Sequence, residues 1–139
     1  MASNHDRIIT DEDRRFMKMA CDLACENVEQ GGGPFGAVIV KDGEVIAAAG
    51  HSVTLDNDPT AHAEINAIRR ACSITRSVKL DGCVIYSNCE PCSMCLNALY
   101  RAGVSRIYYA TTAADAATVL ASCSCYYATI DFHSAASAP

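Results

Sequence analysis

The 139-residue sequence predicts an α/β domain in which a mixed β-sheet is covered by helices on both faces. A helical segment precedes two strand-like segments, and these are joined by Asp42-Gly43, a dipeptide typical of hairpin turns. In the second half, strand-like and helix-like segments alternate, which favours parallel strands joined by right-handed crossovers. At this length we expect residues 1–139 to form one domain around a single core.

The first predicted element is a helix that begins after Thr10. Threonine is a good N-cap, and the three acidic residues that follow it suit the positive end of the helix dipole. Phe16, Ala20 and Ala24 then recur at helical spacing. The glycines and proline of residues 31–34 end the helix, and we interpret them as a turn because they lack the pattern of a phosphate-binding loop.

A hairpin and a second helix are predicted next. Residues 35–40 and 44–49 predict the two strands, and residues 51–57 predict a polar loop. Asp58 is a suitable N-cap and Pro59 suits a first helical position, so we expect the second helix to begin there. Its expected apolar face consists of Ala61, Ile65, Ile68 and Cys72.

The remaining elements follow the same reasoning. Residues 84–86 predict a third strand, residues 91–101 a helix ended by Gly103, and residues 104–110 a fourth strand. The tail, residues 113–139, differs in character because it contains no Lys or Arg. Within it we expect a short helix over residues 113–120, a fifth strand over residues 126–132 and disorder over residues 134–139.

One pattern of histidine, glutamate and cysteine residues indicates a metal-binding catalytic site. His62-Ala63-Glu64 is followed, after 27 intervening residues, by Cys92-Ser93-Met94-Cys95 with a proline directly before it. Taken alone, Cys92 and Cys95 could be a redox pair or half of a structural zinc knuckle, and His62 an ordinary histidine. Together, His62, Cys92 and Cys95 provide three zinc ligands and leave a fourth position open, as in catalytic zinc sites. The combined pattern is the signature of zinc nucleobase deaminases, with Glu64 as the acid/base residue.

Composition limits the class of partner and the compartment. The formal net charge is −5, which disfavours a nucleic-acid partner because such proteins usually show a basic face. No segment approaches the length of a membrane span, and the first residues lack the apolar stretch of a signal peptide. We therefore expect a cytoplasmic protein without membrane contact. The nine cysteines are an odd number, and we expect them to be mostly reduced.

Three segments resemble the cytidine deaminase-like superfamily, and within it the small guanine deaminases. They are residues 33–43, 57–64 and 89–96. The resemblance implies a three-layer α/β/α fold with a mixed five-stranded sheet, a homodimer, and one zinc ion per chain held by His62, Cys92, Cys95 and a water. It also implies that Glu64 transfers protons while an exocyclic amine is hydrolysed.

The resemblance further implies a set of substrate contacts. Phe35 would lie against the flat base, the backbone N–H of Ala63 would hold a ring carbonyl, and Glu90 would shape the pocket. His51 stands where the relatives carry an asparagine that contacts the base edge. We consider both a substrate contact and an ordinary loop histidine at this position. The tail also departs from the family, because residues 120–123 replace a Gly-Phe-Asp-Asp stretch that includes a second catalytic acid.

The leading functional hypothesis is zinc-dependent deamination of a free purine base, guanine to xanthine and ammonia. One alternative is deamination of another nucleobase, a nucleoside, an aminotriazine or a tRNA adenosine, because the tRNA adenosine deaminases share the same motif cores. An alternative of another class is a catalytically inactive protein that binds metal and acts as a partner. The presence of Glu64 argues against it, since an inactive protein needs no proton shuttle.

Overall fold

The computed structural model describes residues 2–3, 8–111 and 128–131. The helices of this part of the chain are α1 (Asp11–Glu29), α2 (Val53–Asp56), α3 (Ala63–Thr75) and α4 (Ser93–Ala102). Its strands are β1 (Ala2–Ser3), β2 (Gly33–Lys41), β3 (Glu44–His51), β4 (Cys83–Cys89), β5 (Arg106–Thr111) and β6 (Ala128–Asp131). None of the described helices is long and apolar enough to cross a bilayer.

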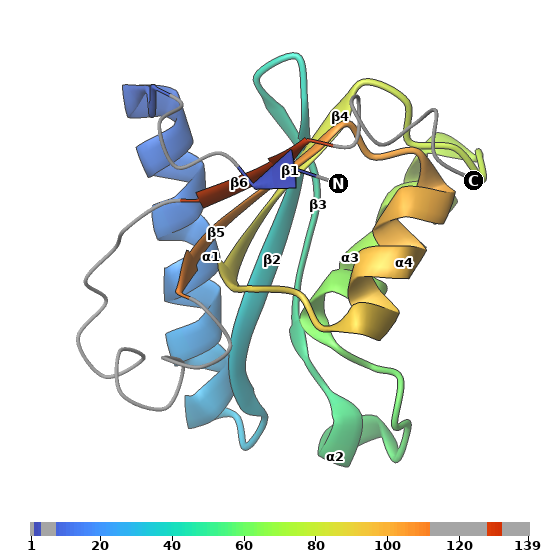
Figure 1. Cartoon of the computed structure of the whole chain (residues 1–139). Helices are drawn as coiled ribbons and strands as arrows, with labels where there is room; N and C mark the ends of the chain where they lie inside the picture. The colour runs from blue at the N-terminus through green and yellow to red at the C-terminus, as the bar shows by residue number, and fades with distance from the viewer. Residues whose placement is uncertain (1, 4–7, 112–127, 132–139) are drawn as a thin grey trace.

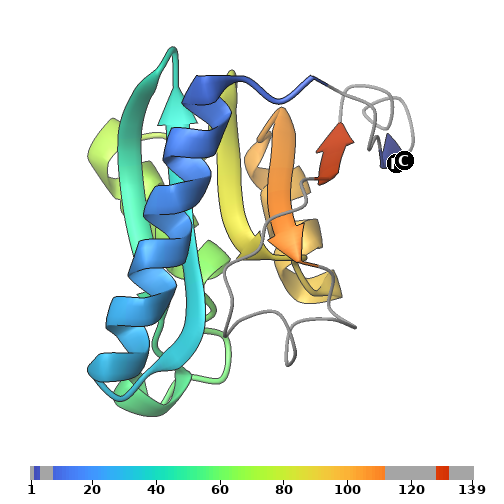
Figure 2. The ribbon, with the colours of Figure 1, turned by 90° about the vertical axis from the view of Figure 1, so that its left-hand side faces the viewer.

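The strands form one mixed sheet in the order β1-β6-β5-β4-β2-β3. Strands β4 and β5 pair in parallel through the crossover helix α4, and the other described pairs are antiparallel. Helix α1 covers one face of the sheet, and α3 and α4 cover the other (Figure 1; Figure 2 shows α1 lying along its own face). The predicted three-layer α/β/α architecture with a mixed sheet is therefore confirmed.

The described residues form a six-stranded sheet, whereas five strands were expected. Strands β2 to β6 each overlap one of the five segments predicted as strands, and the two-residue strand β1 adds a sixth by pairing with β6. So short a strand has no alternation of side chains that a sequence pattern could reveal. The helix predicted at residues 113–120 and the disorder predicted at residues 134–139 lie outside the described residues.

The hairpin of β2 and β3 is longer than predicted at its open end, where His51 lies. Strand β2 already begins at Gly33, which pairs with His51 at the end of β3. Residues 51–57 are therefore not one polar loop, because His51 belongs to β3 and Val53–Asp56 form the single turn α2. The pairing is irregular between Gly33 and Gly36, so Phe35 lies in a bulged part of β2.

Both faces of β2, which lies between β4 and the edge strand β3, are buried. Val38 and Val40 belong to a core under α1, and Ala37 and Ile39 belong to a second core under α3 and α4. This alternation follows from the two-residue period of a strand.

The face that α3 turns to the sheet differs from the expected one. Its fully buried apolar residues are Ala63, Ala67 and Ala71. Ile68 and Cys72, which we expected to face the core, are half-buried and pack at its margin. Alanine side chains allow the helix to approach the sheet closely, and the bulkier side chains then lie on its flank.

Helix α1 carries a buried acidic residue that also completes its N-terminal cap. Thr10 and Asp13 form a capping box, as the sequence of this turn predicts for Thr10. Asp13 is 7% exposed and accepts a second hydrogen bond from the Tyr86 hydroxyl of β4. Tyr86 stacks on Tyr108, with ring centroids 4.6 Å apart. The hydrogen bond between Asp13 and Tyr86 therefore connects α1 to β4, and the stacked rings extend this contact to β5.

The Tyr86 hydroxyl should stabilise the fold in a pH-dependent way. Burial, followed by the hydrogen bond to Asp13, raises the pKa of Tyr86. A phenol pKa that is higher in the folded state contributes stability fully below about pH 10 and loses it as the pH rises further. We expect Tyr86→Phe to lower the free energy of unfolding by about 1.5–3 kcal/mol at neutral pH, measured by urea denaturation. The difference from the parent should shrink at about pH 11, and an undiminished difference would contradict this account.

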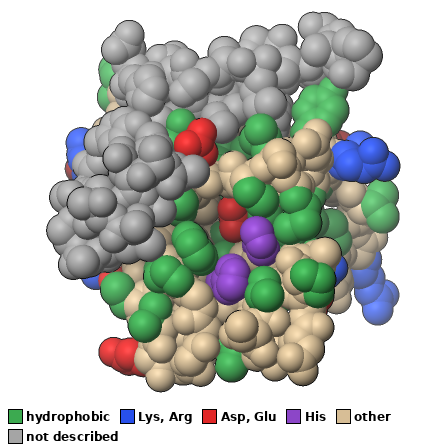
Figure 3. Space-filling view, turned by 60° about the horizontal axis from the view of Figure 1, so that its bottom comes forward, with side chains coloured by type: hydrophobic (Ala, Val, Ile, Leu, Met, Phe, Trp, Pro, Cys, Tyr) green, Lys and Arg blue, Asp and Glu red, His purple; other side chains and the backbone are tan. Residues whose placement is uncertain are grey.

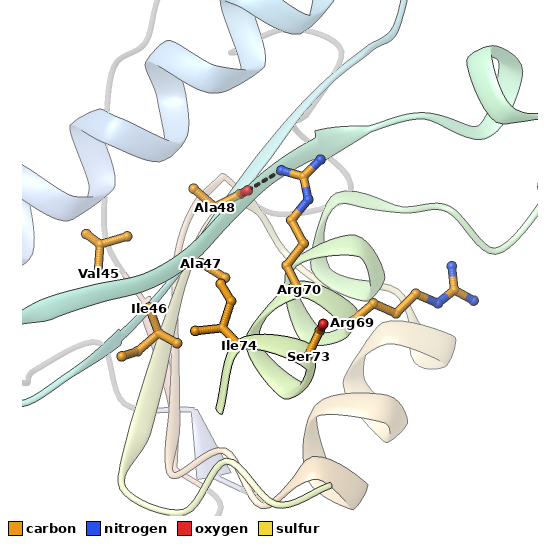
Figure 4. Close-up of a pocket in the computed structure, with 8 residues that line it drawn as sticks. All are labelled: Val45, Ile46, Ala47, Ala48, Arg69, Arg70, Ser73 and Ile74. Carbon is orange, nitrogen blue, oxygen red and sulfur yellow. Dashed lines mark hydrogen bonds between the residues drawn. The ribbon is translucent and has the colours of Figure 1, made fainter. Parts of the chain in front are cut away.

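Strand β3 is an edge of the sheet, and a shallow groove of about 560 Å³ runs between it and α3. Arg70 of α3 reaches across this groove and donates a hydrogen bond of 2.6 Å to the Ala48 carbonyl (Figure 4). Natural sheets often protect an edge strand with a charged side chain. Arg70 is a charged side chain placed over the edge strand β3 in this way.

Candidate metal centre and its cavity

His62 lies just outside α3 and points its ring toward the other candidate ligands. We expected the helix to begin at Asp58 and Pro59, and this was wrong. The Asp58 carboxylate instead accepts hydrogen bonds from the backbone N–H and the hydroxyl of Thr60, which closes a tight turn before the helix. The helix begins at Ala63, and His62 is its N-cap in an extended conformation.

Cys92 occupies the same place in α4. This helix begins at Ser93, two residues later than predicted, with Cys92 as its extended N-cap and Cys95 in its first turn. The N-termini of α3 and α4 therefore both carry metal-ligand candidates, which the hydrogen-bond distances below bring to one point. Their backbone N–H groups and dipoles favour negatively charged ligands such as thiolates.

The three side chains have the spacing of a tetrahedral zinc site. His62 Nδ1 lies 3.6 Å from Cys92 Sγ and 3.5 Å from Cys95 Sγ, and the three atoms lie within 4.8 Å of one another. Typical Zn–S and Zn–N bonds at tetrahedral angles place sulfur and nitrogen about 3.6 Å apart. Two sulfurs and one imidazole nitrogen are also a donor set that zinc prefers. The residues present therefore fit a zinc ion.

The electrostatics of the cluster also favour a cation. Cys95 is fully buried, and burial, followed by the nearby charge of Glu64, raises the pKa of its thiol. A buried thiolate beside a carboxylate is unfavourable without a compensating positive charge. A bound zinc ion would supply that charge.

Glu64 lies in the first turn of α3, two residues after His62. It is only 6% exposed, and burial raises the pKa of its carboxyl group, while hydrogen bonds to its backbone and to Cys95 lower it. A carboxyl group with a raised pKa is suited to accept and return protons near neutral pH. The sequence predicted this residue as the acid/base group, and the structure places it beside the three ligands.

These residues open into a cavity of about 220 Å³. Its lining consists of Phe35, His51, His62, Glu64, Cys89, Glu90 and Cys92. Figure 3 shows the face of the molecule on which it opens, with the two described histidines beside an acidic side chain. A cavity in which several polar side chains converge beside an apolar wall is typical of sites for small molecules.

All eight predicted site residues lie at or directly behind this cavity. Cys95 and Ala63 are fully buried behind the wall, and the other six line it. Cys89 also lines the cavity and was not predicted. Its position at the end of β4, directly before Glu90, is the signal that could have identified it, because ligands often bind beyond the ends of strands in α/β sheets.

His51 contributes to the wall through its ring. The ring centroid lies 5.4 Å from that of Phe35 and 5.4 Å from that of His62. Burial, followed by the proximity of His62, lowers the pKa of His51, which favours the neutral imidazole. Its Nδ1 atom is buried and has no hydrogen-bond partner among the described residues.

The sequence of this chain is similar to those of known proteins. The family model "Cytidine and deoxycytidylate deaminase zinc-binding region" matches residues 10–111. A guanine deaminase of Bacillus subtilis is 55% identical over 103 residues, which are 73% of this chain and 66% of that protein. A tRNA-specific adenosine deaminase of Aquifex aeolicus is 43% identical over 94 residues, which are 68% of this chain and 62% of that protein.

A solved structure agrees with the fold. The X-ray structure of guanine deaminase from Bacillus subtilis superposes with a TM-score of 0.73 at 54% identity, over 75% of this chain and 67% of that one. The chain spans about two thirds or less of the length of the two curated relatives above.

Proposed function

Because this chain belongs to the cytidine and deoxycytidylate deaminase zinc-binding family, we propose that it deaminates a free purine base, converting guanine and water to xanthine and ammonia. The observation that supports this most is the buried Glu64 beside three zinc-type ligands in a cavity of about 220 Å³. The higher identity to a guanine deaminase than to a tRNA deaminase supports the substrate.

In the proposed mechanism His62, Cys92 and Cys95 would hold the zinc ion. When bound, zinc is a Lewis acid that lowers the pKa of a coordinated water toward neutrality. Glu64 takes one proton from the attacking water and delivers it to a ring nitrogen. It then takes the remaining proton of that water and transfers it to the departing amine, which leaves as ammonia. The carbon–nitrogen bond to the amine breaks, and the carbon retains the oxygen as a carbonyl.

The other lining residues are proposed to bind the base. Phe35 supplies a flat surface for the ring, and His51 contacts its edge from the neighbouring position. Glu90 accepts hydrogen bonds from N–H groups of an amino-substituted ring. The Ala63 backbone N–H, at the start of α3, is proposed to hold a ring carbonyl. The lining of this cavity by Phe35, His51 and Glu90 supports these assignments.

We also propose that residues 1–139 act as a single deaminase domain in a cytoplasmic homodimer, with a small-molecule base and no nucleic acid as partner. The low number of basic residues supports the last point, with 11 Lys and Arg against 16 Asp and Glu. Both basic residues of α3 are already engaged within the chain. Arg69 pairs with Asp58, and Arg70 binds the Ala48 carbonyl.

A panel assay tests the substrate. Zinc-loaded protein is incubated with guanine, other amino-purines, amino-pyrimidines, nucleosides, aminotriazines and a tRNA anticodon arm, and ammonia release is measured. We expect guanine to give the highest kcat/KM. Conversion of another amine with guanine unchanged would overturn the assignment, and tight tRNA binding at physiological salt would support the tRNA adenosine deaminase alternative.

A further inference from the structure

Asn27 connects α1 to the part of the hairpin that forms the cavity wall. Its side-chain amide donates hydrogen bonds of 2.7 Å to the Gly33 carbonyl and 2.6 Å to the His51 carbonyl. These two residues are paired across β2 and β3 at the edge of the irregular segment between Gly33 and Gly36. The amide therefore holds the two strands together at the point where their regular pairing is interrupted.

Three glycines leave the space that this arrangement needs. A Cβ atom on Gly32 would lie 2.4 Å from Asn27 Nδ2, and one on Gly50 would lie 2.4 Å from Asn27 Oδ1. A Cβ atom on Gly33 would lie 2.7 Å from Nδ1 of the His51 ring. All three separations are shorter than any ordinary contact, so glycine is needed here for space. The amide of Asn27 and the ring of His51 are thus both packed against bare backbone.

Two further asparagines hold the neighbouring backbone. Asn88 of β4 accepts a hydrogen bond from the Gly36 N–H and donates one to the Pro34 carbonyl, on both sides of Phe35. Asn66 of α3 donates to the Gly50 carbonyl and to the Ser52 hydroxyl, on both sides of His51. Asn27 alone of the three binds the carbonyl of His51 itself.

We propose that Asn27 is a positioning residue for substrate binding, which fixes the backbone of Gly33 and His51 and thereby sets the His51 ring against Phe35. The inference rests on the proposed function for the chemistry, and it assigns the role to a residue that does not line the cavity. Its side-chain hydrogen bonds go to the wall formed by β2 and β3, and within the described part of the chain none goes to a metal ligand or to Glu64. Loss of its amide should therefore weaken binding of the base more than it slows the chemical step.

The test replaces Asn27 with aspartate, which has the same shape but places an oxygen against the two carbonyls. Asn97→Asp is the matched control, because Asn97 also donates a hydrogen bond to a carbonyl, that of Ser93, at 2.7 Å, but is exposed on α4. We expect Asn27→Asp to raise KM for guanine about tenfold while kcat changes less than about threefold. Asn97→Asp should resemble the parent. A KM for Asn27→Asp equal to that of the control would overturn the proposal.

Two further measurements keep the proposal testable if Asn27→Asp does not fold or guanine is not the substrate. Gly33→Ala places a methyl group against the His51 ring, and an unchanged KM in this variant would overturn the link between ring position and binding. Without substrate, the ring carbon resonances of His51 can be followed by NMR, since the chain has only four histidines. They should shift in Asn27→Asp and not in Asn97→Asp. Unshifted resonances overturn the proposal, whereas guanine left unchanged by the parent overturns only the proposed function.

Discussion

Glu64→Gln should strongly slow deamination and leave the metal content of the protein unchanged. Glutamine preserves the shape of the side chain but cannot accept a proton from the attacking water. General acid–base catalysis by one positioned group contributes about 10²–10⁴ in rate, so we expect kcat to fall by about 10³-fold or more. Because Glu64 is not one of the three ligands that lie within 4.8 Å of one another, zinc binding should not depend on it.

The measurement combines initial rates of guanine loss with elemental analysis of zinc per chain. Glu44→Gln is the matched control, since Glu44 is exposed. It is the first residue of β3, whereas His51 of the cavity wall is the last. The control should have the activity of the parent. This experiment also decides between an enzyme and an inactive metal-binding partner, because equal background rates in parent and Glu64→Gln would mean that the chain does not catalyse the reaction.

The three ligands and Glu64 could be predicted because each short motif lies within one turn of chain at a helix start. The spacing of Cys92 and Cys95 places both on one side of a helix terminus wherever that helix lies in the fold. The exact start of the His62 helix could not be predicted in the same way. Asp58 has the chemistry of an N-cap and of a turn residue, and only the N–H group that it meets, here that of Thr60, decides between the two.

The cavity wall depends on contacts between residues far apart in the sequence. Asn27 reaches His51, and Asn88 reaches Gly36, across 24 and 52 positions respectively. No local pattern reports such hydrogen bonds, since they depend on how α1 and β4 pack against the hairpin. For the same reason the sequence left two interpretations of His51 open, whereas the structure places its ring between Phe35 and His62.

Cys95→Ser should remove the stabilisation that zinc gives to the fold. A ligand that binds only the folded state stabilises it by about 4 kcal/mol when its free concentration is about 1,000 times its dissociation constant. Serine is a poor zinc ligand, and Cys95 is fully buried in the first turn of α4. We therefore expect the parent to gain about 4 kcal/mol in free energy of unfolding under these conditions, and Cys95→Ser to gain almost nothing.

The free energies of unfolding are measured by denaturant titration with and without a chelator. Cys83→Ser is the matched control, because Cys83 is also buried, at 2% exposure, but lies at the end of β4 opposite Cys89 and the cavity. Both serine variants should be less stable than the parent without zinc, since each places a hydroxyl in a packed core. Only Cys83→Ser should recover stability when zinc is added, because its three ligands are intact. If Cys95→Ser responds to zinc as the parent does, Cys95 is not a ligand and the proposed metal centre is wrong.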